Sequence, residues 1–307
     1  MGISNDVALP VVKHWVPAAD EENDMNRTET LDPRPVSFTG HGGLRLAGDE
    51  WGDKGRPLVL LLHGGGQTRH SWKGTGERLA ARNLRVIALD ARGHGDSEWA
   101  TGSALYSLEL FAADVVSVIR QLDEPVVIVG ASLGGLTGIL VADEVGNDLV
   151  RKLVLVDIVP RMERKGGLRV RDFMLRHLDG FARLEDAADA IADYMPHRTR
   201  PSNLDGLQRN LRQRDNGRWY WHWDPRFVQE PMDDPAEQAN DIELKAANLR
   251  IPLLLIRGAI SDVVSRHSAR RFLEAVPSAQ YIELDGAAHT APGDDNDSFT
   301  SVVVEFV

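Results

Sequence analysis

The sequence predicts an α/β fold with a mostly parallel sheet, helices on both faces of that sheet, and an inserted helical cap. Two observations support this prediction. Short apolar runs alternate along the chain with helix-length segments, which is the order expected where helices join parallel strands. Between residues 160 and 247 this alternation stops, and charged, helix-like segments replace it before the apolar runs resume at 251–258.

The strands and helices of the core are predicted from their apolar patterns. Residues 36–51 alternate apolar and polar side chains around Gly42-Gly43, which indicates a hairpin. The other strands are continuous apolar runs, as expected for strands buried on both faces, and lie at 57–63, 84–90, 125–130, 150–158, 251–258 and 279–286. Helices, with apolar residues three and four positions apart, are expected at 71–82, 106–122, 133–145, 265–276 and from about 297.

The interrupted stretch is interpreted as a cap inserted into the core. It holds no run typical of a buried strand, and its candidate helices lie at 167–178, 183–195 and 203–215. The residues that precede the hairpin show no periodic apolar face. We therefore divide the chain into an N-terminal arm at 1–35, a core at 36–160 and 248–307, and a helical cap at 161–247.

Composition excludes several classes of function. The chain has 307 residues and a formal charge of −11, so its surface is expected to repel nucleic acid. It contains no cysteine, which excludes disulfides, thiolate catalysis and cysteine-based metal sites. No stretch reaches the roughly 18 apolar residues of a membrane span, and the first residues lack a signal-peptide pattern. We predict a cytoplasmic protein without a membrane span; nothing in the sequence indicates a particular oligomeric state.

Ser132 is the candidate nucleophile. Residues 130–134, Gly-Ala-Ser-Leu-Gly, match the G-x-S-x-G pattern and lie directly between a predicted strand and a predicted helix. In such a tight turn the serine backbone is strained, and its hydroxyl projects beyond the strand end, beside the positive end of the helix. Without this context the motif predicts no more than a glycine-rich connection.

A serine hydroxyl needs a base, and the base needs a carboxylate that fixes its tautomer. His289 follows the last predicted strand, at the same edge of the sheet as Ser132. Asp262 lies just past the strand 251–258, again at that edge, and is favoured because its strand is expected beside that of His289. Asp157, at the end of the strand 150–158, is a rival in the same layer.

The developing oxyanion of an acyl transfer needs hydrogen-bond donors. Residues 63–67, His-Gly-Gly-Gly-Gln, follow a central strand, and their glycines allow the backbone to approach a substrate closely. We predict the amides of Leu133 and Gly65 as the two donors, with Gly66 as the fallback for the second. A phosphate-binding loop is disfavoured because no GK[ST] follows these residues.

Five ordered motifs together resemble the α/β-hydrolase superfamily: "LLHGGG", "DARGHGDS", "VGASLGGL", "RGAISD" and "GAAHTAP". The resemblance covers residues 36–307. It implies an eight-stranded sheet, a helical cap, a Ser132–Asp262–His289 triad, and no cofactor or metal. The sequence departs from the family in two places. Ala288 stands where many members have glycine before the catalytic histidine, and the three glycines of "HGGG" resemble the oxyanion loop of certain lipases and esterases more than the bulkier HG-aromatic version.

The residue at the nucleophile position narrows the reaction that the resemblance implies. Haloalkane dehalogenases and epoxide hydrolases of this superfamily have aspartate there, and residue 132 is serine. The capped serine members include ester hydrolases, and residues 218–227 and 285–299 resemble those of bacterial small-ester hydrolases such as monoalkyl phthalate hydrolases. We predict a hydrolase of a small carboxylic ester. A C–C bond hydrolase, a lactonase, a perhydrolase, and a non-catalytic receptor on the same scaffold stay open.

Aromatic residues of the cap are candidates for the substrate pocket. Residues 219–223, Trp-Tyr-Trp-His-Trp, are rich in large rings, which suit an apolar pocket with a polar handle. We predict that Met162, Trp221 and Trp223 line this pocket. The alternative is that these side chains anchor the cap to the core.

Overall fold

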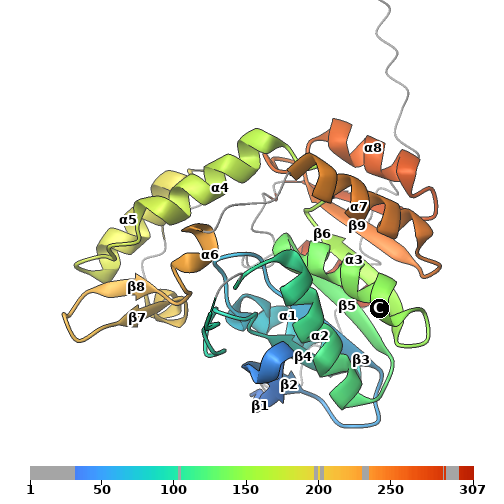
Figure 1. Cartoon of the computed structure of the whole chain (residues 1–307), viewed down its shortest axis with the longest axis horizontal. Coiled ribbons are helices and arrows are strands. Elements are labelled where there is room, and N and C mark those ends of the chain that lie inside the picture. The colour runs from blue at the N-terminus through green and yellow to red at the C-terminus, as the bar shows by residue number, and fades with distance from the viewer. Residues whose placement is uncertain are drawn as a thin grey trace, which may run out of the picture.

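A single eight-stranded sheet lies at the centre of the protein (Figure 1). The computed structural model describes residues 32–102, 105–196, 200, 204–229, 235–285, 287 and 297–307. In spatial order the strands are β1 (Arg34–Thr39), β2 (Arg45–Trp51), β4 (Arg85–Leu89), β3 (Leu58–Leu62), β5 (Val126–Ala131), β6 (Val150–Val156), β9 (Leu253–Gly258) and β10 (Gln280–Leu284). The β1–β2 and β2–β4 pairs are antiparallel, and every other pair is parallel.

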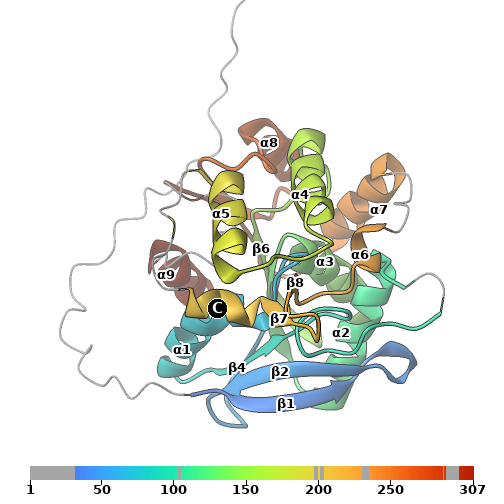
Figure 2. The same cartoon turned by 90° about the vertical axis from the view of Figure 1, so that its left-hand side faces the viewer.

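Helices cover both faces of this sheet, as predicted. One face packs against α2 (Leu108–Leu122), α3 (Leu133–Val145), α7 (Pro235–Asn248) and α8 (Arg266–Ala275). The other packs against α1 (Lys73–Ala81) and α9 (Asp297–Phe306), which Figure 2 shows on the side opposite α2 and α3. Successive residues of one strand point to opposite faces of the sheet. Leu60 packs in the apolar cluster on the α2–α3 face, and Leu61 packs in the cluster on the α1–α9 face. This two-sided burial explains why the central strands are continuous apolar runs.

After β6 the chain leaves the sheet and forms a helical insertion at the carboxyl ends of the strands (Figure 1). It contains α4 (Arg164–Arg176), α5 (Leu184–Tyr194), a 3-10 helix at Asp205–Arg209, the short strands β7 (Leu211–Gln213) and β8 (Trp219–Trp221), and α6 (Arg226–Gln229). Two further 3-10 helices, His41–Gly43 and Arg69–Trp72, belong to the core. None of the helices in the described part of the chain has the length and hydrophobicity needed to cross a bilayer.

The predicted helix at 203–215 is wrong beyond its first turn. The chain there passes from the 3-10 helix into β7, which pairs with β8 in an antiparallel hairpin. Gly217 has φ +75° in the connecting turn, and Arg214 and Arg218 close the turn with a backbone hydrogen bond. The Asn216-Gly217 dipeptide favours such a turn, and the aromatic residues after it have high strand propensity.

The predicted division into arm, core and cap stays a prediction. The predicted end of the cap, at residue 247, falls within helix α7, which packs on the core. Helix α7 contacts α3 and α8, and Ile242 and Ala246 belong to the main apolar cluster of the core. The insertion that stands over the strand ends therefore comprises the elements from α4 to α6.

Glycine is required at position 134 by the packing of α3 on the sheet. A Cβ atom there would lie 2.3 Å from the Leu62 carbonyl oxygen. We expect Gly134→Ala to lower the free energy of unfolding by about 3 kcal/mol, measured by urea denaturation, because backbone must move. Gly74→Ala in α1 is the matched control, since nothing lies within 4 Å of its Cβ position and alanine favours a helix. Equal midpoints for the two variants would contradict this account.

Candidate functional site

Ser132 lies at the sharp turn where β5 ends and α3 begins. Its backbone has φ +48° and ψ −114°, and its amide donates to the Val156 carbonyl of the neighbouring strand at 3.1 Å. A Cβ at Gly130 would lie 2.2 Å from the Gly134 carbonyl oxygen, so the turn is closed by direct backbone contact. The predicted strand–turn–helix context of the serine is therefore present, with its backbone in a region that costs about 1–3 kcal/mol.

The glycine loop after β3 lies beside this turn. A Cβ at Gly64 would be 3.3 Å from the Cβ of Ser132. The Gly64 amide donates to the Gln67 side chain at 3.1 Å, and the Gly66 amide, at φ +77°, donates to His94 Nε2 at 3.1 Å. Among the described residues, neither the Gly65 amide nor the Leu133 amide has a hydrogen-bond partner. Those two are the predicted donors, and the fallback Gly66 already uses its N–H.

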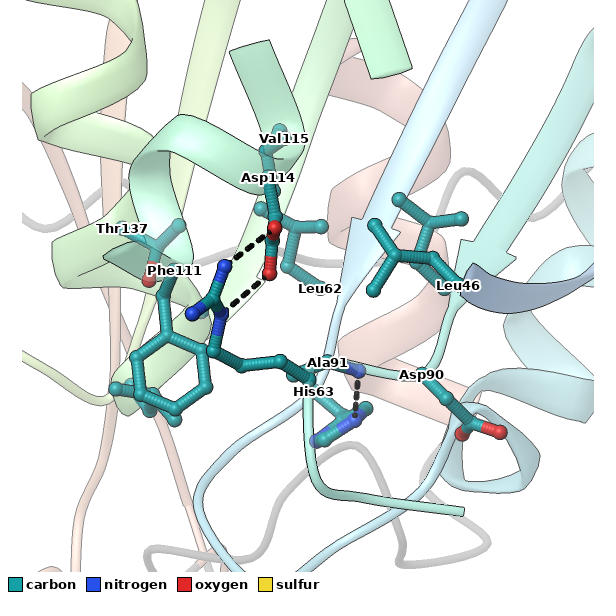
Figure 3. A pocket seen from close by; sticks show the side chains of 13 residues that line it. Leu46, Leu62, His63, Asp90, Ala91, Phe111, Asp114, Val115 and Thr137 are labelled. Atoms are coloured by element: carbon teal, nitrogen blue, oxygen red, sulfur yellow. Dashed lines mark hydrogen bonds and ion pairs between the residues drawn. The ribbon is translucent and has the colours of Figure 1, made fainter. Parts of the chain in front are cut away.

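Two buried histidines join this loop to the turn that follows β4. The Ala91 amide donates to His63 Nε2 at 3.0 Å (Figure 3), so the Nδ1 proton of His63 points to the Gly64 carbonyl 2.8 Å away. In the same way His94 Nε2 accepts from Gly66, and its Nδ1 donates to the Arg92 carbonyl at 2.9 Å. Burial lowers the pKa of His63 to about 4 and that of His94 to about 3. Both rings are therefore neutral near pH 7.

Asp157 is fully buried at the end of β6, next to Ser132. The Ser132 amide bonds to the residue just before it, Val156, and the Asp157 backbone has φ +49°. Its carboxylate accepts from the Gly258 amide at 2.9 Å and from the Ser261 hydroxyl at 2.5 Å. Asp157 and Ser132 thus end adjacent strands, and both have positive φ without being glycine.

Asp262, the acid predicted from the sequence, lies in a different environment. Its side chain is 40% exposed and forms an ion pair with Arg169 of α4 at 2.6 Å. Arg169 also stacks over the Tyr194 ring, so the pair connects the loop after β9 to the helical insertion. The role of Asp262 as triad acid stays a prediction.

His289, the predicted base, lies outside the described residues. The described residue nearest to it in sequence is Ala287, whose carbonyl accepts from the Ile260 amide at 3.1 Å. Strand β10 is parallel to β9, so the segment after β10 leaves the sheet at the edge where residues 258–262 lie. The predicted pairing of His289 with the other residues is untested.

Of the predicted pocket residues, Met162 and Trp223 contact the core, whereas Trp221 packs within the insertion. Trp223 is 2% exposed and packs with Met174 and Val228, while Trp221 and Met162 are half-buried. A small cavity of about 10 Å³ lies beside the two tryptophans, lined by His177, Leu178, Arg214, Tyr220, Trp221, Trp223 and Pro225. Trp223 also forms an isolated backbone bridge with His94 of the core, and a pocket role for Met162, Trp221 and Trp223 stays a prediction.

Phe227 was not identified from the sequence. Its ring, from α6, packs on the glycine loop, since a Cβ at Gly65 would lie 3.1 Å from it. It also meets the His94 ring edge-on, with centroids 4.9 Å apart. One phenylalanine at the end of an aromatic stretch carries no signal that would set it apart from core packing.

A second cavity lies behind the loop, on the α2–α3 side of the sheet (Figure 3). Its wall includes Leu133, Phe111 and the ion pair of Arg92 with Asp114, which forms two hydrogen bonds of 2.7 Å. The cavity has a volume of about 30 Å³. No group of three or more metal-ligating side chains occurs among the residues that the structure describes.

The neutral histidines make stability depend on pH. An unfolded histidine has a pKa near 6.5, so acid protonates the unfolded chain first, and the stability present above pH 6.5 declines toward pH 4. Each such histidine lowers the free energy of unfolding by ~2 kcal/mol at pH 5, relative to its value at neutral pH. We expect His63→Gln to lose less stability than the wild type between pH 7 and pH 5 in urea unfolding. An identical pH dependence of the two proteins would contradict a neutral, buried His63.

The chain is similar to known hydrolases in sequence and in structure. Residues 59–301 match the model of the alpha/beta hydrolase family. The chain is 34% identical to an esterase of Mycobacterium tuberculosis over 225 residues, 70% of each protein. It is 29% identical over 259 residues to a 3-hydroxybutyrate-oligomer hydrolase of Cupriavidus necator, covering 80% of this chain and 87% of that one. A crystal structure of an alpha/beta hydrolase from Novosphingobium aromaticivorans, at 25% identity, superposes with a TM-score of 0.76 over 90% of this chain and 99% of that one.

Proposed function

Because the chain belongs to the alpha/beta hydrolase family, we propose that it hydrolyses a small carboxylic ester through an acyl-enzyme at Ser132. The observation that carries this proposal is the strained serine beside the backbone amides of Gly65 and Leu133, which have no hydrogen-bond partner in the part of the chain that the structure describes. The names of the relatives, an esterase and an oligomer hydrolase, support ester cleavage.

The proposed reaction has two steps. Ser132 Oγ attacks the ester carbonyl while His289 takes its proton, and the Gly65 and Leu133 amides hold the oxyanion. The alkoxide leaves with the proton from His289, which gives the acyl-enzyme. Water then attacks the acyl carbonyl with His289 as base, and the proton returns to Ser132 as the carboxylic acid departs. No cofactor or metal takes part.

We propose Asp157, the rival of Asp262, as the carboxylate that orients His289. Asp157 is fully buried and rigidly held by Gly258 and Ser261, and a buried carboxylate stabilises an imidazolium more strongly than an exposed one. Asp262 is 40% exposed and is already paired with the Arg169 guanidinium, which offsets its negative charge.

Removal of the nucleophile tests the reaction itself. We expect Ser132→Ala to lower kcat on p-nitrophenyl acetate by roughly 10⁴-fold or more, because the hydroxyl that forms the acyl-enzyme is gone. A fluorophosphonate probe should label the wild type at Ser132 and leave the variant unlabelled. Unchanged turnover in the variant would reject an ester hydrolase that works through this serine.

The same assay separates the competing functions. A non-catalytic receptor would neither turn over esters nor react rapidly with the fluorophosphonate. A C–C hydrolase would cleave a vinylogous diketone and leave simple alkyl esters intact. A panel of aliphatic, aromatic and monoanionic esters then defines the size and charge of the substrate.

Two aspartate variants test the choice of carboxylate. We expect Asp157→Asn to lower kcat by roughly 10³–10⁴-fold, because the base loses the charge that stabilises its protonated form, and Asp262→Asn to lower it by less than about 10-fold. Arg169→Gln is the matched control, since it breaks the same ion pair and keeps the Asp262 carboxylate.

Folding of both variants is checked by urea denaturation, and Ser261→Ala provides a second measurement. This variant removes one donor to Asp157 and should lower kcat by about 10-fold, with the acid limb of the pH profile displaced. A larger loss of kcat in Asp262→Asn than in Asp157→Asn would show that Asp262, and not Asp157, is the carboxylate that orients His289.

A further inference from the structure

We propose that His94 is a positioning residue of the oxyanion hole, and that Phe227 of the insertion holds its ring in place. The inference rests on the proposed function, because the group that is positioned is the Gly65 amide. On this proposal the insertion helps to position the oxyanion-hole amide, in addition to any effect it has on the shape of the substrate pocket.

The glycine loop and the turn after β4 are joined reciprocally. The loop supplies His63, which accepts from the Ala91 amide of the turn, and the turn supplies His94, which accepts from the Gly66 amide of the loop. The two rings lie 5.2 Å apart between these backbones. Each imidazole therefore accepts a hydrogen bond from a half-buried amide of the opposite segment.

This arrangement fixes the peptide groups on both sides of Gly65. The Gly64 amide is held by Gln67, and the Gly66 amide is held by His94 at a φ of +77°. The Gly65 amide lies between them and has no partner among the described residues. Loss of the acceptor on His94 would leave the Gly66 amide without its partner, and the loop would turn to satisfy it.

His94 keeps its acceptor over the working pH range. Its ring is fully buried, and burial together with the nearby His63 lowers its pKa, so Nε2 stays unprotonated. The Nδ1 proton is held by the Arg92 carbonyl, which sets the tautomer. Arg92 is itself fixed by its buried ion pair with Asp114.

The insertion docks on the same turn. The Gly95 amide donates to the His222 carbonyl, and the Asp224 amide donates to the Gly93 carbonyl, both at 2.7 Å. These bonds flank an isolated antiparallel bridge between His94 and Trp223. The insertion is thus hydrogen-bonded directly to the backbone that carries His94.

Phe227 of the insertion also packs on both His94 and the glycine loop. Its ring meets His94 at an interplanar angle of 73° and packs on Gly65, where a Cβ atom would lie 3.1 Å from the ring. Its helix is fixed by Asp224, which is 1% exposed and accepts from the Tyr106 hydroxyl and from Arg226. A change in Phe227 therefore acts on His94 and Gly65 together.

The test compares His94→Gln with His94→Leu. Glutamine can accept from the Gly66 amide through Oε1, whereas leucine cannot. We expect His94→Leu to lower kcat on p-nitrophenyl acetate by roughly 10²-fold with KM changed less than about 3-fold, and His94→Gln to restore most of that loss. The Ki of an aryl trifluoromethyl ketone, which forms a tetrahedral adduct with the serine, should rise by the same factor as kcat/KM falls.

We expect Phe227→Leu to lower kcat by about 10-fold, with KM nearly unchanged and the ketone Ki raised by the same factor as kcat/KM falls. Phe181→Leu is the matched control, because Phe181 is buried within the insertion, and it should leave kcat and the ketone Ki unchanged. Equal kcat in His94→Leu, His94→Gln and the wild type overturns the proposal, as does a loss carried by KM alone. Failure of the proposed function is seen separately, as activity that persists in Ser132→Ala.

Discussion

The turn between β5 and α3 is the constraint on which the rest of the site depends. Two glycines allow the backbone of the strand and the first turn of the helix to touch, and one of them also rests on the carbonyl of β3. The serine between them is held at a positive φ, beyond the end of the sheet and at the amino end of a 13-residue helix. Since helix and sheet are both buried, the strain of the turn is balanced by the packing of the whole core.

The edge of the sheet above this turn brings together segments from distant parts of the sequence. Parallel strands have their carboxyl ends at one edge, so the loops after β3, β5, β6 and β9 lie side by side there. The glycine loop lies so close to Ser132 that a Cβ atom added at Gly64 would be 3.3 Å from the Ser132 Cβ, and the loop after β9 reaches Asp157 through Ser261. A site of this kind is built on rigid elements and needs only short loops to place its side chains.

The helical insertion is tied to this edge by more than side-chain packing. Its backbone pairs with the turn at 93–95, Arg169 pairs with the loop after β9, and Thr68 of the core donates to Asn210. Charged side chains extend the contact, since Asp96 lies between Arg69 of the core and Arg212 of the insertion, and these cations lower its pKa to about 2. The insertion therefore has a defined position relative to the glycine loop.

The sequence by itself determined the alternation of strands and helices, because burial on both faces of a parallel sheet requires continuous apolar runs. It also determined the strand–turn–helix context of Ser132, because only glycine fits the two flanking positions. It did not reveal the β7–β8 hairpin, where local turn geometry overrode a helical pattern. Only the tertiary structure decided that His94 accepts from Gly66, that Phe227 rests on Gly65, and that Asp157 is buried while Asp262 pairs with Arg169. These are contacts between segments far apart in the chain, and no local pattern of residues encodes which of two carboxylates becomes buried.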